Sequence, residues 1–498
     1  MIQKKIYQWA KTQPSRQAVV WNTISLDYAS FANTIEVVRQ RLKGEQPGRD
    51  GTAVVLGRNL LPVWINVIAL RALGVTTVSV ITLNQAVSLE LNNVVWVVVA
   101  STEDLNGGEL GDIPFGDAKL TWSLPTINRS QQLLAIPQES FSVSGGHILY
   151  TSGTTGTNKK VLLPAEHEDL RNEARIVSMG LNRDTIYYGS SIPIGTSAGY
   201  KTPLSVWHAG GSVVFEQPTA YKNLLDLDIT HAFLVPAFLR NLLHHVERAK
   251  PFSKRQFTLM TGGSFLALDL AERIKLVLTE TLIIGYFSTE CAAGPLMSSK
   301  YVSKDDLHWL TPDADRSIQV VNEKGEQCAD GEEGRLRIES KATDCHAYMD
   351  DPKASAEVFR HGYFYPGDLA IRRSDGRIRV IGRIADVVNL QGFKVAVAPL
   401  EQWIQDTLKV EEVCVFAGMS DSGKDELVVA VQSKDKLIDA DLQDRVRAAI
   451  LASLPKIVSF EHIRIFTFPQ FPRDEVGMRK TQRAVLRKKI FDQIDSMT

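Results

Sequence analysis

The stretch that most constrains this chain is a loop of small residues between two short apolar runs. Residues 148–150 (Ile-Leu-Tyr) and 161–163 (Val-Leu-Leu) are typical of strands, and seven small residues, 151–157, follow the first run. Glycine lets a phosphate chain approach main-chain N–H groups closely, and Ser or Thr hydroxyls donate hydrogen bonds to it. Lys159 and Lys160 add positive charge at the exit of the loop. The pattern predicts a phosphate-binding strand–loop–strand unit.

Two other interpretations of this loop are less consistent with the residues. A Walker P-loop needs Gly-Lys-Ser/Thr at the start of a helix, and residues 156–160 (Gly-Thr-Asn-Lys-Lys) do not provide it. A flexible surface linker would not need strand-forming runs at both ends.

Composition describes an ordinary globular protein with an available core. A chain of 498 residues suggests about three domains. Its formal net charge of -1 favours neither nucleic acid nor an anionic membrane as the main partner. The four cysteines are far apart and form no Cys-x-x-Cys pair, which argues against a disulfide framework or a zinc site. Without an apolar stretch for a signal peptide at the N-terminus, we expect a cytoplasmic protein.

The first 145 residues alternate helical periodicity with β-branched runs at 52–56, 75–81 and 94–100, which predicts a layered α/β domain with a mostly parallel sheet. Residues 61–81, interrupted by Asn66, Arg71 and Gly74, predict an amphipathic helix followed by a strand rather than a membrane span. Strands leading into turns at 230–236 and 259–264 are candidates for pocket lining, because open α/β sheets bind ligands beyond the carboxyl ends of their strands.

Residues 150–159 resemble the phosphate-binding loop of the acyl- and aryl-CoA synthetase, adenylation-domain and luciferase superfamily, whose pattern is Tyr-Thr-Ser-Gly-Thr-Thr-Gly-x-Pro-Lys-Gly. Asn158 replaces the proline and Lys160 the last glycine. Further segments resemble the same superfamily in the expected order, at 191–199, 284–290, 331–338, 362–369, 386–401 and 471–483. The resemblance therefore covers nearly the whole chain.

The resemblance implies an α/β fold with two domains. A large N-terminal domain, residues 1–383, would contain layered α/β subdomains and a small β-rich subdomain. A small mobile α+β domain, residues 384–498, would follow a hinge at 384–386, where Ala385 replaces the usual Asp or Lys.

The resemblance also implies an ATP site with magnesium. Tyr286 would stack on adenine, Thr289 would hydrogen-bond the α-phosphate, and Glu290 would bind Mg²⁺. Asp368 and Arg383 would contact the ribose, although Pro-Gly-Asp is also a common turn. The phosphate contacts would be Thr151, Ser152, Gly153, Thr154, Thr155, Gly156 and Lys159, with Lys160 competing for the lysine role.

The acid pocket departs from the family pattern. Gly195 and Thr196 stand where a bulky Phe-His pair is usual, although they also match a plain Gly-rich turn. Phe287 replaces the glycine at the pocket floor, which would shorten the pocket. An aromatic or a short to medium aliphatic monocarboxylate is therefore expected, in a pocket lined by Gly195, Thr196, Gly263, Ser264, Phe287 and Cys291.

The C-terminal segments imply a second half-reaction with CoA. Gly392 would give the pantetheine arm room to pass, and Gln391-Gly392 also matches a hairpin turn. Aligning Arg483 on the closing arginine of the family makes Lys480 the catalytic lysine, with Arg479 as the competing assignment. A compact ammonium suits the charge developing between carboxylate and α-phosphate better than a planar guanidinium.

The resemblance as a whole implies an AMP-forming carboxylate–CoA ligase that uses ATP, Mg²⁺ and CoA. Two alternatives stay open at this point. The enzyme could pass its adenylate to a carrier-protein thiol in trans or to an amine. The altered residues Asn158, Lys160, Phe287 and Ala385 are also compatible with a catalytically weak nucleotide-binding homologue. The sequence names neither the acid nor the oligomeric state.

Overall fold

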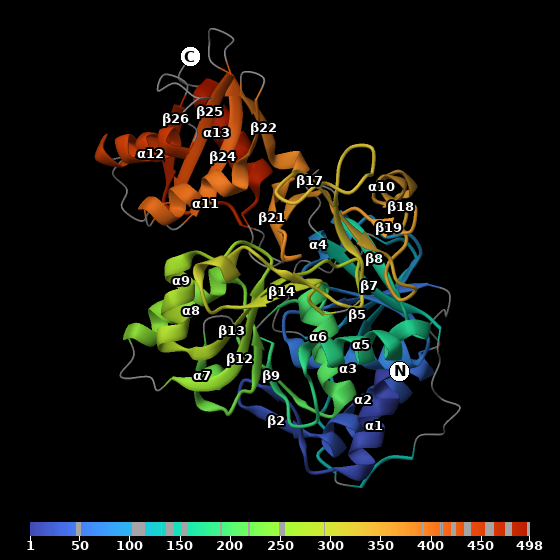
Figure 1. The fold of residues 1–498 in the computed structure, drawn as a ribbon. Helices are drawn as coiled ribbons and strands as arrows, with labels where there is room; N and C mark the ends of the chain where they lie inside the picture. Colours follow the sequence, from blue (N-terminus) through green and yellow to red (C-terminus); the bar gives the residue numbers. More distant parts are fainter. Residues whose placement is uncertain are drawn as a thin grey trace.

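The protein is built from two large sheets, a smaller β-rich sheet and a C-terminal α+β unit, which lies at the top of Figure 1 in orange and red. The computed structural model describes residues 1–45, 51–101, 115–130, 132–135, 144–151, 158–189, 192–217, 220–248, 254–292, 294–390, 393–408, 410, 412–419, 425–432, 440–453, 463–473 and 481–495.

The largest sheet has nine strands in the order β15-β14-β13-β12-β11-β9-β10-β1-β2. From β1 to β13 in this order the neighbours are parallel, and antiparallel strands complete both edges. The strands are β1 Gln17–Trp21, β2 Ile24–Asp27, β9 Ile186–Tyr188, β10 Ser212–Phe215, β11 His231–Phe233, β12 Arg255–Gly262, β13 Thr279–Tyr286, β14 Met297–Lys300 and β15 Thr311–Pro312.

Helices cover both faces of this sheet. Helices α7 (Lys222–Asp226), α8 (Pro236–Arg248) and α9 (Leu268–Val277) lie on its outer side, and α9 packs on β13. Helices α1 (Ile2–Thr12), α2 (Tyr28–Gly44), α5 (Glu168–Met179) and α6 (Ser197–Ala209) form a helical layer with α3 (Leu60–Ala72).

The second sheet confirms the predicted strand–loop–strand unit. Its order is β6-β5-β3-β4-β7-β8, with β8 antiparallel to β7 and the other pairs parallel. The ladder of β7 and β8 ends with Thr151 opposite Lys159, so the small-residue loop begins where a buried hairpin ladder stops. The elements are β3 Thr52–Leu56, β4 Thr76–Val80, α4 Leu83–Ser88, β5 Val94–Val99, β6 Lys119–Trp122, β7 Gly146–Thr151 and β8 Lys159–Pro164.

Helix α3 is not amphipathic, so that prediction was wrong. Every residue from Leu60 to Ala72 except Pro62 is buried, because the helix lies in the core cluster shared by the two large sheets. Its polar residues are satisfied internally: Asn66 donates to the carbonyl of Ser123 at 3.0 Å and Arg71 pairs with Glu168 at 2.8 Å. No helix among the described residues is both long and apolar enough to cross a membrane.

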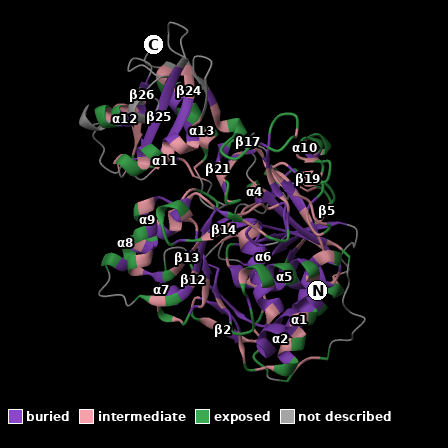
Figure 2. Cartoon of the chain, viewed as in Figure 1, coloured by how far each residue is buried: buried purple, intermediate pink, exposed green. Residues whose placement is uncertain are grey.

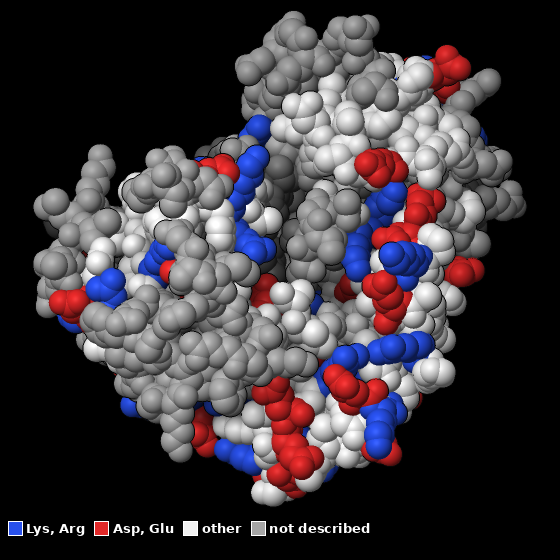
Figure 3. Space-filling model, turned by 90° about the horizontal axis from the view of Figure 1, so that it is seen from above, with Lys and Arg blue, Asp and Glu red and all other residues white. Residues whose placement is uncertain are grey.

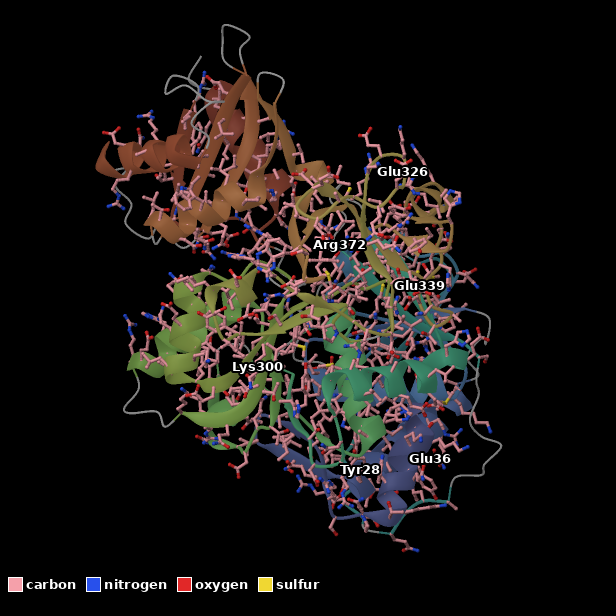
Figure 4. The ribbon with its side chains drawn as sticks, in the orientation of Figure 1. Tyr28, Glu36, Lys300, Glu326, Glu339 and Arg372 are labelled. Atoms are coloured by element: carbon pink, nitrogen blue, oxygen red, sulfur yellow. The ribbon has the colours of Figure 1, made fainter. Side chains whose placement is uncertain are left out.

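The β-rich sheet connects the two large sheets to the C-terminal unit. Its order is β18-β19-β17-β20-β21, with β16 also paired to β17. In Figure 4, the labelled Glu339 and Arg372 lie on this sheet, far from Tyr28 and Glu36 in the N-terminal helical layer. The elements are β16 Ile318–Val321, β17 Glu333–Glu339, α10 Pro352–Val358, β18 Phe359–Arg360, β19 Tyr363–Phe364, β20 Asp368–Arg372 and β21 Ile378–Arg383.

The C-terminal unit has its own core, as expected for a separate domain. It packs α11 (Val397–Leu408) and α12 (Ala440–Ser453) on one face of a three-stranded sheet, and α13 (Arg483–Asp495) on the other. Figure 2 shows these strands as buried and the outer helix faces as exposed. The strands are β24 Glu412–Met419, β25 Asp425–Gln432 and β26 Ile463–Phe468, preceded by the hairpin β22 Val387–Leu390 and β23 Phe393–Ala396.

The predicted fold class, layered α/β with a β-rich subdomain and a small α+β C-terminal domain, is confirmed. A 3₁₀ turn, Ile384–Asp386, directly follows β21. The boundary after Arg383 stays a prediction.

His147 on β7 couples folding to pH. Its ring stacks on Tyr200 with centroids 3.9 Å apart, and Nδ1 lies 2.8 Å from the hydroxyl of Thr77. Burial, aided by the charge of Arg71, lowers the pKa of His147 to about 3. The folded state therefore keeps a neutral imidazole at a pH where the unfolded chain binds a proton.

We predict that His147→Gln flattens the loss of stability on acidification. Between about pH 6.5 and pH 3 only the unfolded state protonates His147, which lowers the free energy of unfolding by about 1.4 kcal/mol per pH unit at most. Urea unfolding at pH 8 gives the packing cost of the substitution, since His147 is neutral in both states there. Parallel stability–pH curves for the two proteins between pH 6 and 4 would contradict the prediction.

Candidate active site

The candidate site lies at the carboxyl ends of β12 and β13, where the two strands stay in parallel register as far as Gly262 and Gly285. The chain then turns through residues 287–292 before it returns along β14, and this segment is called the β13–β14 turn below. The turn carries Phe287, Thr289, Glu290 and Cys291, four of the residues singled out from the sequence.

Three residues predicted to bind the nucleoside come together at this edge. The hydroxyl of Tyr286 donates to Oδ2 of Asp368, and Nε of Arg383 lies 3.0 Å from Oδ1 of the same carboxylate. Asp368 starts β20 and Arg383 ends β21, in directly opposed positions of that antiparallel pair. Burial and the carboxylate of Asp368 raise the pKa of Tyr286, so the phenol stays a neutral donor.

Glu290 is held by two hydroxyl groups. Its Oε1 accepts from the hydroxyl of Tyr348 at 2.7 Å, and its Oε2 accepts from Ser288. The ammonium of Lys159, at the start of β8, lies 4.8 Å from the centroid of the Tyr348 ring. Tyr348 therefore links the carboxylate of the β13–β14 turn to the lysine at the exit of the phosphate loop.

The structure separates the roles of the two lysines that the sequence left in competition. Lys160 is buried, and its ammonium donates to the carbonyl of Glu90 at 2.8 Å and pairs with Asp350 at 3.2 Å. Lys159 is only partly buried and points the other way along β8, toward Tyr348. Of these two lysines, Lys159 is the one that lies over the ring of Tyr348, whose hydroxyl bonds Glu290.

Sequence reasoning missed Lys201, whose ammonium anchors the main chain of the β13–β14 turn. This lysine of α6 is buried, and its ammonium donates to the carbonyls of Thr289 and Cys291 at 2.7 and 2.8 Å. Burial and the nearby Arg175 lower the pKa of Lys201 to about 7. The signal in the sequence was a lysine inside an otherwise apolar helix, between Tyr200 and Thr202.

A buried ion pair holds the other side of the turn. Asp344 accepts from the main-chain N–H of Ala292 at 2.7 Å and from both terminal nitrogens of Arg316. The main-chain N–H of Cys345 donates to the carbonyl of Glu290 at 2.8 Å. Neither Tyr348 nor Asp344 carries a local motif, since both belong to an irregular segment between β17 and α10.

Phe287 occupies the floor of the predicted acid pocket. A Cβ atom on Gly285 or Gly262 would lie 2.5 or 2.9 Å from the Phe287 ring, so the ring covers both glycines. Its other side meets Phe233 edge to face, with ring centroids 5.3 Å apart. The two rings therefore pack together next to the carboxyl ends of β11, β12 and β13.

The remaining predicted pocket residues lie around this floor without forming one surface. Thr196 caps α6, with Oγ1 accepting from the N–H of Gly199 at 3.2 Å, which agrees with the turn interpretation. Gly263 and Ser264 line a cleft of about 210 Å³ that is shared with Ala398, Glu401 and other residues of the C-terminal unit. Cys291 is buried in the core cluster on the other side of the sheet from the one that Phe287 contacts.

Several predicted site residues lie outside the described residues: Ser152, Gly153, Thr154, Thr155, Gly156, Gly392, Arg479 and Lys480. Their neighbours are described. Leu390 and Phe393 form the last pair of the hairpin β22–β23, so residues 391–392 connect two antiparallel strands. Arg483 donates to Glu401 at 2.7 Å and to the carbonyl of Val415 at 2.8 Å, which anchors the start of α13.

The face seen from above in Figure 3 carries basic and acidic side chains that alternate over its described part. This agrees with the formal net charge of -1.

Comparisons with known proteins fit this geometry. Residues 142–343 match the family model described as AMP-binding enzyme. A 4-chlorobenzoate–CoA ligase from Arthrobacter sp. is 25% identical over 487 residues, covering 93% of this chain and 90% of that protein.

Two solved structures share the fold. The amide bond synthetase McbA from Marinactinospora thermotolerans superposes with a TM-score of 0.80 at 18% identity, covering 98% of this chain and all of that one. An O-succinylbenzoate CoA synthetase from Bacillus subtilis, in complex with ATP and magnesium ion, gives 0.78 at 17%, covering 97% and 99%. Residues 142–343 of this chain therefore match the AMP-binding enzyme family, and nearly the whole chain is similar to a CoA ligase.

We predict that Gly195→Ala destabilises the protein, because the added Cβ would overlap the ring of Tyr150. Overpacking of this kind costs about 1–3 kcal/mol in free energy of unfolding. The matched control is Gly44→Ala near the end of α2, where a Cβ meets no atom within 4 Å and φ is not positive. Thermal unfolding of both variants checks this, and an equal melting temperature for the two would contradict it.

Proposed function

We propose that this chain is an AMP-forming carboxylate–CoA ligase, with ATP, a carboxylic acid and CoA as substrates. The observation that carries the proposal is the line from Glu290 through Tyr348 to Lys159. Tyr348 contacts both the buried carboxylate of Glu290 and the ammonium of Lys159, which follows the predicted phosphate loop, and this supports the proposal. An anionic triphosphate with a bound divalent cation needs both kinds of group side by side.

The nucleoside end of ATP fits the cluster formed by Tyr286, Asp368 and Arg383. The two oxygens of Asp368 can accept both ribose hydroxyls, with Arg383 fixing the carboxylate from the opposed strand. Tyr286 borders the same position and offers an aromatic face for adenine. The adenosine and the phosphates would then lie along the carboxyl edge of β13.

Glu290 is the residue that would hold Mg²⁺. This fits the preference of Mg²⁺ for one or two carboxylates completed by substrate phosphates and water. Ser288 and Tyr348 orient the carboxylate, as hydrogen-bonded partners of metal ligands do. When bound, the ion would neutralise charge on the phosphates.

The acid would lie between the phosphate loop and the Phe287–Phe233 floor. Its carboxylate attacks the α-phosphorus of ATP, the bond to pyrophosphate breaks, and an acyl-adenylate forms. The substrate is its own nucleophile, so the residues of this chain position and stabilise charge rather than form covalent bonds. Thr289 would donate to the α-phosphate, and Lys480 would approach the reacting oxygens from the C-terminal domain.

CoA is the acceptor we favour, because the chain aligns with nearly the full length of a chlorobenzoate–CoA ligase. The C-terminal domain would rotate at residues 384–386, withdraw Lys480 and present Gly392 to the pantetheine thiol. An amine acceptor is the second candidate, favoured by the likeness to an amide bond synthetase, and a carrier-protein thiol in trans is a third. We place the reaction in the cytoplasm, in keeping with four free and buried cysteines.

Two departures that suggested a weak homologue have structural explanations. The extra charge of Lys160 is paired with Asp350, and the ring of Phe287 rests on two glycines. Each of these departures has its complement in the fold, so neither argues against an active enzyme.

We predict that a panel of aromatic and short to medium aliphatic acids includes one that drives pyrophosphate release, with the thioester as product when CoA is present. Tyr348→Phe should lower kcat for pyrophosphate release by about 10- to 100-fold, because Glu290 loses an orienting donor. Tyr7→Phe is the matched control, since it removes a hydroxyl bonded to the carbonyl of Leu134, a contact made by helix α1.

The same assay tests the roles proposed for the C-terminal residues Lys480 and Arg479. Lys480→Ala should abolish pyrophosphate release but keep thioester formation from preformed acyl-adenylate, and Arg479→Ala should keep both. If the enzyme forms the adenylate but no thioester with CoA, and an amide or a carrier-bound product appears instead, the acceptor is an amine or a carrier protein rather than CoA. ATP binding with no pyrophosphate exchange for any acid would overturn the proposed function.

We predict that Phe287→Ala shifts specificity toward longer acids. Removing the ring opens the space over Gly262 and Gly285. Each methylene newly accommodated should be worth about 10- to 200-fold in kcat/KM. The measurement is the ratio of kcat/KM for consecutive members of a homologous acid series, in which any loss of folded enzyme cancels. An unchanged ratio would show that the ring does not lie on the path of the acid.

A further inference from the structure

Helix α5 turns its polar residues inward. Glu168, Arg171, Asn172 and Arg175 recur at the spacing that normally carries apolar core residues, and each is less than 10% exposed. Leu170 and Val177 on the opposite face are 56% and 80% exposed. Burial of polar and charged groups is costly unless they are paired, so an inverted helix of this kind calls for a specific partner.

A small cavity lies between α5 and α6. Its volume is about 20 Å³, enough for one or two water-sized groups. It is lined by Leu163, Glu168, Arg171, Asn172, Arg175, Tyr200, Lys201, Leu204 and Ala292. Lys201 and Ala292 connect it to the β13–β14 turn, since Lys201 bonds the carbonyls of Thr289 and Cys291.

The lining has an excess of positive charge. Arg171 and Arg175 face one carboxylate, Glu168, which is already engaged, and Lys201 adds a further positive charge when it is protonated. Its Oε2 pairs with Arg71 at 2.8 Å and its Oε1 accepts from the main-chain N–H of Ile2 at 2.6 Å. Two nearby carboxylates are also engaged, Asp344 with Arg316 and Glu290 with Tyr348 and Ser288.

Donors without acceptors line the same cavity. Nη1 of Arg171 and Nδ2 of Asn172 are buried, and no described atom accepts a hydrogen bond from either. The hydroxyl of Ser205 lies 3.0 Å from Oδ1 of Asn172 and 2.9 Å from the carbonyl of Lys201, and its single proton serves one of these two acceptors. An ammonium has three N–H groups, and Lys201 uses two of them on the turn.

We propose that this α5–α6 cavity binds a monovalent inorganic anion of about the size of chloride, held by Arg171, Asn172 and Lys201. The anion accepts the three donors and balances the excess charge, whereas water would accept hydrogen bonds without balancing charge. The small volume of the cavity favours a compact anion over a larger one. Because Lys201 also holds the β13–β14 turn, the anion stabilises the segment that carries Glu290. Binding of the anion does not depend on the proposed function.

The experiment compares thermal unfolding of the full chain in sodium chloride and in sodium gluconate at constant ionic strength and pH. Wild type should show a saturable rise in Tm with chloride. Crystals soaked in sodium bromide should show one anomalous peak between α5 and α6. The proposal would be overturned if Tm did not rise with chloride and the cavity either showed no bromide peak or held ordered water instead.

Two variants test the assigned ligands. Arg171→Met and Asn172→Leu should each lose the chloride-dependent rise in Tm. Arg183→Met, which removes an arginine that is 65% exposed, should keep it in full. If Arg171→Met does not fold, Asn172→Leu and the bromide experiment still decide. An equal chloride response in all four proteins would show general screening and would overturn the site.

Discussion

The structure around the site depends on keeping one buried carboxylate, Glu290, in a fixed place. A buried charge is expensive unless its oxygens are bonded, and here Ser288 and Tyr348 bond both. The main chain on either side is held by Lys201 from α6 and by Asp344. The nine-stranded sheet with helix α6 and the segment between β17 and α10 must therefore be packed together before the turn is complete, which ties the geometry of the site to the contact between these two parts.

Two residues that depart from the family pattern at this site are each accommodated by other residues of the chain. Lys160 would be an unpaired buried charge without Asp350, and Phe287 would clash without Gly262 and Gly285. Compensation of this kind links residues that are distant in sequence. It shows that these two departures are accommodated within the fold.

Most strands were predictable because their signal is local. The β-branched runs at 52–56 and 94–100 and the hairpin around the phosphate loop appear where periodicity places them. Helix α3 was mispredicted as amphipathic, because burial on all sides is decided by the two sheets that enclose it. Helix α5 shows the converse, since its inward polar face follows from a charged neighbourhood that periodicity cannot reveal. Tyr348 and Lys201 were missed because each acts through a contact made only in the folded chain.

The sequence by itself determined the two strands that flank the small-residue loop, the fold class and the resemblance to adenylate-forming enzymes, because small residues at fixed spacing and local periodicity carry that information. Only the tertiary structure decided that Lys159 rather than Lys160 lies over the ring of Tyr348, since Lys160 is paired with Asp350, which is 190 residues away. It also decided that the side chains of Tyr286 and Arg383 meet at the carboxylate of Asp368. Lys159, at the start of β8, reaches Tyr348 in the segment after β17 only in the folded chain, because the two residues are far apart in the sequence.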